Sequence, residues 1–439
     1  MICGNCGTEI QDGVKFCSEC GTKQEKSVSK TTNFSISDRK NKTIRVGKNQ
    51  EIKTLKQALE VINDNGTIIL EFGIYNEHIN FDKEVKLVGA TDSIMEKSSD
   101  ELPIIVLDST KTCKITANVE IEGVVFTHKE NISFDNLQNY ADKKYEFDDD
   151  KEFTKLDTDG YTAIEISSRA ILKNVALLDS QNIGLVYSKE SGILENSLVA
   201  HSYWNNIFCK NNSSPRITNL KLINSNGINL LLSDSANPSV KNCEINNSVE
   251  IGIAVTGQAS GTFEECHIHN VGENGLSVDG NATPKFINCK IHDNTEFALV
   301  ELCDTSNPTL TNCEIYNGGG ISIIVEDQAS GTFEGCNIYD IGDNNGLNIY
   351  GNSTPKFTKC KIHHNTEYAL VFVGERSNPA LIDCEIYNGA NDGIVVEDQA
   401  CGTYENCYLY DNEGENFCNE SSNSIDTSTC KMEWMVNLK

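Results

Sequence analysis

The sequence predicts an all-β solenoid, a parallel β-helix, and two observations support this fold class. The first is a repeat of 23 or 24 residues marked by eight cysteines. A fixed period of this length, with short apolar segments in each unit, is typical of stacked coils of chain. The second is an alternation of apolar and polar residues, which indicates short strands. The repeated cysteines are Cys243, Cys266, Cys289, Cys313, Cys336, Cys360, Cys384 and Cys407.

Each repeat has apolar positions that we expect to face the interior. The second residue after the cysteine is Ile or Leu, as in Ile245 and Leu409, and another apolar pair, such as Leu276 and Val278, precedes the next turn. Asn, Gly and Ser fill the gaps, and the helical segment of a leucine-rich repeat is missing, so turns connect the strands. Stacking the coils at about 4.8 Å places like residues over like and pairs the strand backbones.

The cysteine column continues upstream with other residue types. Leu220 and Ser197 occupy the equivalent positions of the preceding coils. A position that accepts Cys, Leu and Ser is typical of interior packing, where a reduced thiol behaves as a small hydrophobic group. We therefore interpret the repeated cysteines as core residues, with metal or redox use as the alternative.

The N-terminal segment predicts a small zinc-binding module. Two Cys-x-x-Cys-Gly motifs, separated by ten residues, offer Cys3, Cys6, Cys17 and Cys20 as four thiolates for a tetrahedral structural zinc site. A thioredoxin-like redox pair is the alternative, but it requires a βαβ pattern that the sequence does not show. Residues 1–21 resemble the short zinc ribbons at the front of many bacterial and archaeal cytoplasmic proteins. Residues 22–42, rich in Lys, Ser, Thr and Asn, are expected to form a flexible linker.

The charge of the chain argues against a nucleic-acid partner. Residues 1–42 carry 7 basic and 5 acidic side chains, which leaves 29 basic and 59 acidic ones on the rest. Such an acidic body repels nucleic acid, whereas it accepts basic protein surfaces or divalent cations. The sequence shows no signal peptide and no run of 18 apolar residues. Eighteen cysteines then indicate reduced thiols, and we expect a cytoplasmic location without a membrane span.

The start of the solenoid shows a helix followed by a distinctive turn. Thr54 precedes apolar residues at helical spacing, and Asn65 and Gly66 end that pattern, so we expect a short helix that caps the coil. The segment Gly73-Ile74-Tyr75-Asn76-Glu77 follows. This order resembles the entry of the pectin-lyase-like superfamily, in which a capping helix leads into a coil with a Gly-x-Tyr-x-Glu turn. The resemblance implies a right-handed parallel β-helix.

The later coils resemble the carbohydrate-binding and sugar-hydrolysing repeats of F-box-only β-helix proteins, and the two resemblances together cover residues 43–418. The predicted organisation is listed here from the N-terminus: zinc ribbon 1–21, linker 22–42, β-helix 43–418 with an irregular insertion at about 127–161, and C-terminal tail or cap 419–439.

The superfamily includes polysaccharide-degrading enzymes, but their motifs are missing from this chain. The Gly-His-Gly and Arg-x-Lys strings of polygalacturonases do not occur, nor does the Gly-x-x-Asp-Phe-Ile-Phe-Gly string of pectin methylesterases. The pectate lyases need a basic side chain beside calcium-binding acids, and no arginine has such a context. The β-helix arginines are Arg45, Arg169, Arg216 and Arg376. The sequence therefore favours a protein without catalytic activity.

Two outward columns carry the remaining functional candidates. The residue three positions after each cysteine is usually Tyr or His, so stacked rings form an amphipathic strip that is suited to a sugar or to apolar groups of a partner. Ordinary packing on a solvated sheet is the alternative. The candidates for this binding face are His292, Tyr316, Tyr339, His363, Tyr387 and Tyr410.

Acidic residues form the second outward column, close to the turns. Asp304 with Asp327, and Glu375 with Asp398, lie one coil apart, as a Ca²⁺ site or a pair of catalytic carboxyls requires. The alternative is that turn positions favour Asp without any function. These four residues are weak catalytic candidates, because the sequence repeats the pair every three coils.

The main prediction is a non-catalytic interaction protein, in which the zinc ribbon recruits or tethers and the solenoid presents a binding face to a protein or a glycan. The repeat of 70 or 71 residues, which contains three coils, favours an extended surface over one catalytic centre. The alternative is a carbohydrate-active enzyme, a glycoside hydrolase or polysaccharide lyase, of the pectin-lyase-like superfamily. A substrate adaptor like the F-box-only proteins is a third possibility, although no F-box helices precede the coil.

Overall fold

The structure is a computed structural model in which the chain separates into two units, Met1–Lys40 and Asn41–Lys439. The predicted zinc ribbon and linker lie outside the described residues. These residues are 43–90, 92–143, 162–190, 192–294, 297–341, 344–366 and 368–433.

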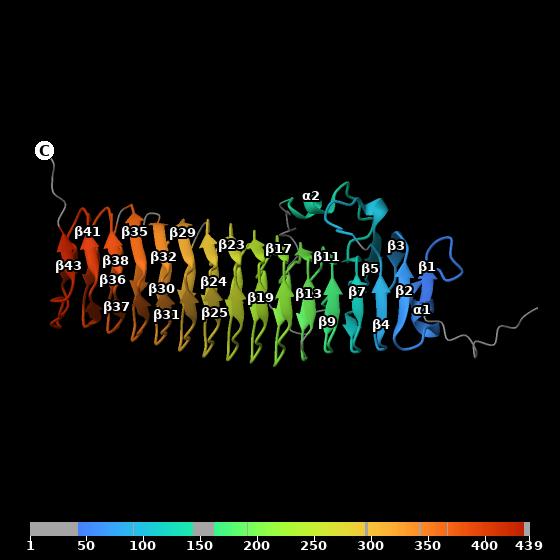
Figure 1. The fold of residues 1–439 in the computed structure, drawn as a ribbon, viewed down its shortest axis with the longest axis horizontal. Helices are drawn as coiled ribbons and strands as arrows, with labels where there is room; N and C mark the ends of the chain where they lie inside the picture. Colours follow the sequence, from blue (N-terminus) through green and yellow to red (C-terminus); the bar gives the residue numbers. More distant parts are fainter. Residues whose placement is uncertain are drawn as a thin grey trace, which may run out of the picture. The chain divides into compact units, whose positions relative to one another are not determined.

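The second unit is a parallel β-helix with three long sheets (Figure 1). Each regular coil gives one strand to each sheet, and every strand pairs in parallel with the strands one coil away. The first sheet contains β1 (Thr43–Val46), β2 (Gly66–Leu70), β4 (Val85–Val88), β7 (Glu120–Glu122), β10 (Ile171–Lys173), β13 (Ile193–Glu195), β16 (Arg216–Thr218), β19 (Ser239–Lys241), β22 (Thr262–Glu264), β25 (Lys285–Ile287), β28 (Thr309–Thr311), β31 (Thr332–Glu334), β34 (Lys356–Thr358), β37 (Ala380–Ile382) and β40 (Thr403–Glu405).

The second and third sheets follow in each coil. The second sheet contains β3 (Gly73–Asn76), β5 (Pro103–Val106), β8 (Val125–Thr127), β11 (Ala176–Leu178), β14 (Leu198–Ala200), β17 (Lys221–Ile223), β20 (Glu244–Asn246), β23 (His267–His269), β26 (Lys290–His292), β29 (Glu314–Gly318), β32 (Asn337–Ile341), β35 (Lys361–Asn365), β38 (Glu385–Tyr387), β41 (Tyr408–Tyr410) and β43 (Lys431–Glu433). The third sheet contains β6 (Cys113–Ile115), β9 (Ile164–Ile166), β12 (Leu185–Tyr187), β15 (Ile207–Cys209), β18 (Leu230–Leu232), β21 (Ile253–Val255), β24 (Leu276–Val278), β27 (Val300–Leu302), β30 (Ile323–Val325), β33 (Leu347–Ile349), β36 (Val371–Val373), β39 (Ile394–Val396) and β42 (Phe417–Asn419). The predicted parallel β-helix is confirmed.

The interior consists of columns of like side chains, as the repeat predicts. Ile245, Ile268 and Ile291 are register partners on successive strands, and all three are fully buried. In the first sheet the rings of Phe333 and Phe357 stack with their centroids 4.5 Å apart. Burial of these columns supplies the hydrophobic free energy that orders the coils.

The cysteine column lies inside the solenoid, so its interpretation as core is confirmed. All eight cysteines are buried free thiols. The Cys336 Sγ donates a hydrogen bond to the Leu310 carbonyl of the preceding coil, at 3.4 Å. A thiol–thiol hydrogen bond with Cys313 and burial raise the pKa of Cys336 to about 12. A hydrogen bond with Cys266 lowers the pKa of Cys243 and of Cys289 instead, so the thiols of the column do not share one direction of shift. All eight lie in the hydrophobic core, where a thiol serves as a small packing group.

Most corners of the regular coils are turned by residues in the left-handed conformation. Asn242 (φ 52°) connects the first and second sheets, Asn247 (φ 54°) follows the second, and Asp327 (φ 59°) follows the third. Only Gly, Asn and Asp adopt this conformation readily, because the carbonyl oxygen crowds the Cβ of other residues. The abundance of these residue types between strands therefore has a direct steric cause.

A short helix, α1 (Leu55–Val61), packs at the N-terminal end of the solenoid, as predicted (Figure 1). Thr54 accepts a hydrogen bond from the Gln57 backbone N–H and thus acts as the N-cap. Glu77 accepts two more bonds, from the Leu55 N–H at 2.8 Å and the Lys56 N–H at 2.9 Å. The glutamate of the Gly-x-Tyr-x-Glu turn therefore holds the capping helix in place.

Two excursions leave the solenoid and cover the outer face of the second sheet over its N-terminal coils (Figure 1). Residues 90–102 include a 3-10 helix (Ser99–Glu101), and residues 128–143 include α2 (Leu137–Ala141). Their apolar side chains, among them Leu102 and Leu137, form a second core with β5, β8, β11 and β14. The sequence predicts only the later excursion, within the insertion at 127–161, and residues 144–161 of that insertion lie outside the described residues.

The first excursion begins where two glycine backbones cross. Gly123 takes the corner position after β7 with φ 69°, and its carbonyl accepts a hydrogen bond from the Ala90 N–H at 2.9 Å. A Cβ on Gly123 would lie 1.7 Å from the Ala90 carbonyl oxygen, and one on Gly89 would lie 2.2 Å from the Gly123 carbonyl oxygen. The chain can therefore leave the coil here only because both residues lack a side chain.

The C-terminal end of the solenoid extends further than the predicted boundary at residue 418. Strand β43 pairs in parallel with β41, with Met432 as the register partner of Leu409. Cys430 lies 23 residues after Cys407 and two before Met432, so the cysteine period continues into this coil, and its Sγ donates to the Tyr404 carbonyl of the preceding coil at 3.4 Å. Within the described ranges, no helix has the length and hydropathy of a membrane span.

Candidate functional site

The predicted strip of rings is a continuous stack on the outer face of the second sheet. Neighbouring rings have centroids 4.6–5.3 Å apart and interplanar angles of 3–16°. We call this set the ring ladder. It consists of His269, His292, Tyr316, Tyr339, His363, Tyr387 and Tyr410.

The geometry of the ring ladder decides what it can bind. Because each ring lies face to face with its neighbours, the ring faces are covered by one another, and the half-exposed edges face solvent. A sugar that stacks on an aromatic face needs a terminal ring of this set, and the terminal Tyr410 already stacks on Tyr408 with the centroids 4.3 Å apart. The ring ladder therefore offers a partner edges and hydroxyl groups, and its role as a binding face stays a prediction.

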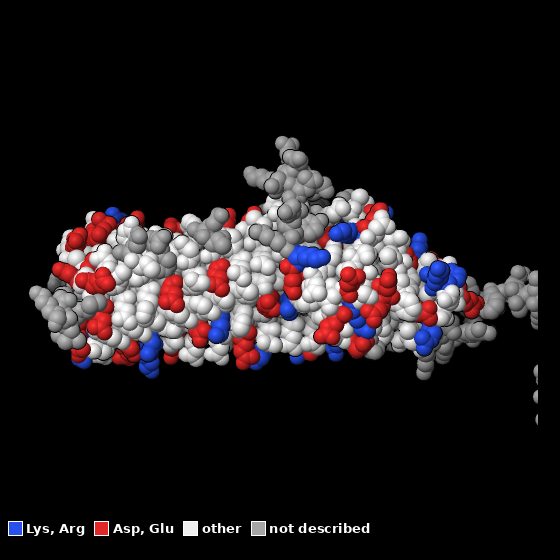
Figure 2. Space-filling view, turned by 90° about the horizontal axis from the view of Figure 1, so that it is seen from above, with Lys and Arg blue, Asp and Glu red and all other residues white. Residues whose placement is uncertain are grey.

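Charged pairs run beside the ring ladder on the same face. The Nζ–O distances are 3.2 Å for Lys221 with Glu244, and 2.8 Å for Lys290 with Glu314. Burial and the neighbouring His364 lower the pKa of His363 to about 4, so the ladder histidine is neutral near pH 7. Acidic side chains are spread along the face shown in Figure 2 and are not gathered in one patch. The second sheet thus presents a regular, half-polar surface.

The predicted acidic pairs occupy the corner that follows the third sheet, and their side chains hold the backbone of the neighbouring coil. The Asp304 carboxylate accepts a hydrogen bond from the Gly280 N–H at 3.1 Å, and that of Glu375 from the Gly351 N–H at 3.0 Å. The Asp327 carboxylate accepts a hydrogen bond from the Asp304 backbone N–H at 3.4 Å, and the Asp398 carboxylate accepts one from the Glu375 backbone N–H at 3.4 Å. All four residues have positive φ. Their placement therefore has a structural explanation, which is the left-handed turn and its bond between coils.

Two substitutions of Asp327 test whether this corner residue has a structural role. Asp327→Asn keeps the side-chain acceptor and a residue type that tolerates φ 59°, so we expect the free energy of unfolding to change by less than about 0.5 kcal/mol. Asp327→Ala removes the acceptor and introduces a residue that tolerates positive φ poorly. We therefore expect the free energy of unfolding to fall by about 1–2 kcal/mol. Urea unfolding followed by circular dichroism measures both values, and equal stabilities of the two variants would contradict this role.

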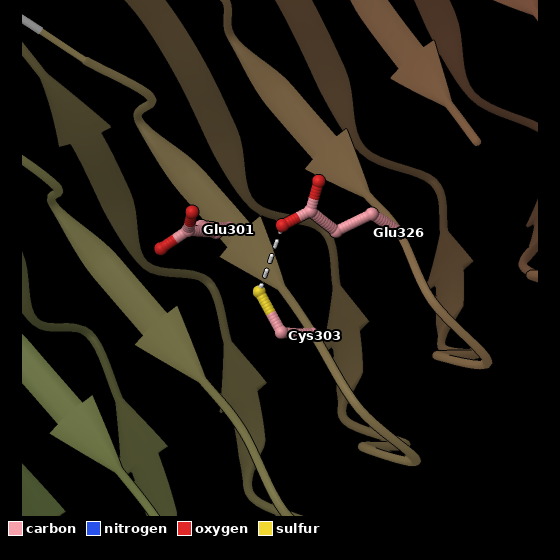
Figure 3. Close-up of side chains that lie close together, drawn as sticks. All are labelled: Glu301, Cys303 and Glu326. Atoms are coloured by element: carbon pink, nitrogen blue, oxygen red, sulfur yellow. Dashed lines mark hydrogen bonds between the residues drawn. The ribbon is translucent and has the colours of Figure 1, made fainter. Parts of the chain in front are cut away.

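The structure brings together a different acidic cluster, on the outer face of the third sheet (Figure 3). Glu301 lies in the middle of β27, Cys303 follows that strand, and Glu326 follows β30 on the next coil. One ligand atom of each side chain lies within 4.8 Å of the other two, and this is the one such group of three among the described residues. All three side chains are half-buried. We call these residues the Glu–Cys–Glu cluster.

Hydrogen bonds fix the Glu–Cys–Glu cluster in place. The Cys303 Sγ donates to a Glu326 carboxylate oxygen at 3.4 Å, as the dashed line in Figure 3 shows. Glu301 accepts from the Asn274 amide at 2.7 Å and from the Ser277 hydroxyl at 3.4 Å. Asn274 in turn accepts from the Ala298 backbone N–H at 3.0 Å. The two carboxyl groups therefore have defined and unequal surroundings.

Electrostatics favour the neutral form of several groups in this region. Burial, and then the nearby charge of Glu326, raise the pKa of Glu301. Burial and the charges of Glu301 and Glu326 raise the pKa of Cys303, so its thiol is protonated. Burial also raises the pKa of Asp279, with the charge of Asp304 as the second cause. Two carboxylates and a thiol are a donor set for zinc, but a metal would have to displace the Cys303 proton.

The sequence shows little of this cluster. Glu326 is visible as an acid beside the predicted pair Asp304 and Asp327, whereas Glu301 is one acidic residue in an apolar strand and Cys303 breaks the cysteine register. Two coils contribute the three residues, so only the register of β27 with β30 makes them neighbours. An acidic residue at the centre of a strand is the signal that could have identified the site.

Comparisons with solved structures give distant likenesses only. A periplasmic alginate epimerase matches with 9% identity and a TM-score of 0.45, over 90% of this chain and 83% of that chain. The catalytic domain of a GH87 α-1,3-glucanase in complex with tetrasaccharides matches with 10% identity and a TM-score of 0.43, over 90% and 68%. A pectate lyase matches with 11% identity and a TM-score of 0.37, over 74% and 76%. No curated protein matches the chain.

Family models describe both parts of the chain. A zinc-ribbon domain model matches residues 2–24, which contain Cys3, Cys6, Cys17 and Cys20. The model of the right-handed β-helix region matches residues 162–307 and 298–433, which together make up more than half of the sequence. The handedness that the superfamily resemblance implies agrees with this match. The chain is therefore a member of the right-handed β-helix family.

Proposed function

We propose that the β-helix acts on a carbohydrate at the outer face of its third sheet, with Glu301 as the proton donor and Glu326 as the second carboxyl group of the pair. The observation that carries this proposal is the pair of carboxyl groups on adjacent coils, held within 4.8 Å, of which Glu301 has a raised pKa. Cleavage of a glycosidic bond needs such a pair, with one carboxyl protonated and the other charged. A perturbed carboxyl with a charged neighbour is a candidate for acid–base work.

The surroundings of the cluster support a sugar ligand. Tyr350 and Phe372 lie on the following coils, and their rings are tilted by 50° at a centroid distance of 5.6 Å. Because they are not stacked, a ring face stays uncovered by its neighbour, in contrast to the ring ladder. Asn348 on β33 is the register partner of Phe372; it is only 3% exposed, and its Oδ1 has no hydrogen-bond partner. Aromatic faces beside amide and carboxyl groups are typical of carbohydrate sites.

The test is a turnover assay with the full chain on a panel of neutral and uronic-acid oligosaccharides, followed by reducing-end release and by the absorbance of unsaturated products. We expect Glu301→Gln and Glu326→Gln each to lower turnover by at least about 100-fold, since general acid–base catalysis contributes roughly that much. The matched control is Asp398→Asn, an acid at the structural corner, which we expect to stay within twofold of the parent chain. Turnover that survives both glutamate substitutions, or no turnover on any substrate, would contradict the proposal.

A second candidate function is protein binding at the ring ladder. The observation that favours it is the flat, regular face of seven aligned rings beside paired charges. Capture of a stoichiometric protein partner by the Glu301→Gln chain, together with no turnover of any oligosaccharide, would favour this function. We further propose that Cys3, Cys6, Cys17 and Cys20 bind a structural zinc ion, which the Cys-x-x-Cys spacing and the family match support.

A further inference from the structure

A second site lies far from the Glu–Cys–Glu cluster, in a cavity of about 650 Å³ at the N-terminal end of the solenoid. Its walls come from the ends of β3, β5 and β8, three successive strands of the second sheet, and from the residues that follow them. The size falls within the usual range for small-molecule sites. The residues that matter for its chemistry are Ile74, Glu77, His78, Asp108, His128 and Glu130.

His128 is a buried side chain with an unused hydrogen-bonding atom. Only 5% of the residue is exposed, and its Nε2 has no hydrogen-bond partner. Its Nδ1 accepts a hydrogen bond from the Gln181 backbone N–H at 3.1 Å. Because a backbone amide can only donate, Nδ1 is unprotonated, and the ring proton of the neutral imidazole lies on Nε2. Burial lowers the pKa of His128 to about 4, so this neutral form prevails near pH 7.

An unpaired N–H donor in a buried place costs free energy, and a ligand that accepts from it recovers that cost. The tautomer also decides against metal coordination at this atom, because Nε2 carries a proton where a metal needs a lone pair. The Nδ1 atom of His78 is a second buried nitrogen without a hydrogen-bond partner. Burial and the nearby Lys111 lower the pKa of His78, which is therefore also neutral.

The charge of the cavity wall limits the ligand further. The lining contains the carboxyl groups of Glu77, Asp108 and Glu130 and, among the described residues, no Lys or Arg. The Glu77 carboxylate already accepts a hydrogen bond from the Leu55 backbone N–H at the start of α1. The Asp108 carboxylate accepts one from the Lys111 ammonium group at 2.6 Å. Three acidic groups repel phosphates, carboxylates and other anions. Ile74, half exposed, gives the cavity an apolar wall.

We propose that this cavity binds a small uncharged sugar, whose hydroxyl groups accept from the Nε2–H of His128 and bond to His78 while its apolar face lies against Ile74. A hydroxyl group both donates and accepts, so it satisfies the two histidines whichever nitrogen of His78 carries the proton. The site requires no activity at Glu301, and it does not depend on the function proposed for the third sheet.

The experiment uses the full chain and titrates it calorimetrically with glucose and cellobiose as neutral probes, galacturonic acid as an anionic probe, and Zn²⁺ as a metal probe. We expect one of the neutral sugars to bind, galacturonic acid to bind at least tenfold more weakly, and Zn²⁺ to leave the His128 resonances unchanged. The variant His128→Asn keeps an acceptor in the Nδ1 position for the Gln181 N–H and removes the Nε2–H. It is expected to weaken sugar binding at least tenfold.

Two measurements separate a lost contact from a lost fold. The thermal unfolding midpoint of His128→Asn should match that of the parent chain, and Ile74→Ala, at an exposed wall residue, should weaken binding by a smaller factor. ¹⁵N-detected histidine spectra should show Nε2 of His128 protonated before sugar is added, and shifted afterwards. Absence of binding by both neutral sugars, a protonated Nδ1, equal affinity of the anionic probe, or Zn²⁺ binding at His128 would overturn the proposal. Glu301→Gln should bind the sugar as the parent chain does, which distinguishes the two sites.

Discussion

Gly123→Asn is expected to destabilise the N-terminal coils by more than about 4 kcal/mol, the largest effect we predict for one substitution. The left-handed conformation is not the reason, because asparagine occupies the same corner in other coils with positive φ, for example Asn174 (φ 51°) and Asn406 (φ 55°). The reason is space, since the new Cβ would lie 1.7 Å from the Ala90 carbonyl oxygen and 2.5 Å from the Ala90 nitrogen. Both are backbone atoms, and hydrogen bonds hold that backbone against β7.

The matched control is Gly257→Asn. Gly257 also has φ 69°, and its added Cβ would lie 3.3 Å from the nearest atom, the Asp234 nitrogen. Asp234 and Asp304 occupy the same corner of other coils, so we expect a change below about 0.5 kcal/mol. Urea unfolding followed by circular dichroism gives both free energies. Similar losses of unfolding free energy in the two variants would contradict this explanation. They would show that the left-handed conformation, and not the close approach of the backbones at Gly123, determines the cost.

Phe333→Ala is expected to lower the free energy of unfolding by about 3–5 kcal/mol, the usual cost of deleting a buried aromatic ring. Phe333 has no exposed surface, and its ring stacks on Phe357 at 4.5 Å, so the substitution leaves a cavity and an uncovered ring. The rigid columns on either side limit collapse into that space.

Phe72→Ala is the control for this deletion, because Phe72 is 71% exposed and removal of its ring should cost less than about 0.5 kcal/mol. Repeat proteins open locally, so hydrogen exchange of the β31 and β34 amides should report the Phe333 effect together with the denaturant midpoint. Exchange that accelerates equally over the whole solenoid would contradict local opening and indicate one cooperative unit.

The regular coils could be predicted from the sequence because their information is repeated. Each of the eight cysteines confirms the register of the others, and the inward Ile245 and outward Tyr316 follow from it by alternation. The period also identifies the acidic corner residues, but it does not show that Asp304 bonds the Gly280 N–H. That role depends on the left-handed backbone conformation of the corner. The only sign of this conformation in the sequence is that other coils have Gly or Asn at the equivalent position.

The candidate sites could not be predicted in the same way, because each depends on a departure from the repeat. Glu301 and Cys303 are single exceptions in an apolar strand and in the cysteine register. The cavity around His78 and His128 lies where the period is lost, since the register partners Asn76, Val106 and Thr127 are separated by unequal lengths of chain. The crossing at Gly123 depends on the first excursion, residues 90–102, and no change in amino-acid composition marks where that excursion begins.

The in-register stacking of the coils also makes the solenoid a spacer of fixed length. β9 is the third-sheet strand of the coil that contains His128, and β27 carries Glu301. These two strands are six positions apart in the third sheet. At about 4.8 Å per strand the two sites are separated by roughly 29 Å along the axis. Insertion or loss of a whole coil between them changes this distance by one step and leaves each site intact. The number of coils between the two sites therefore sets their separation, in steps of about 4.8 Å.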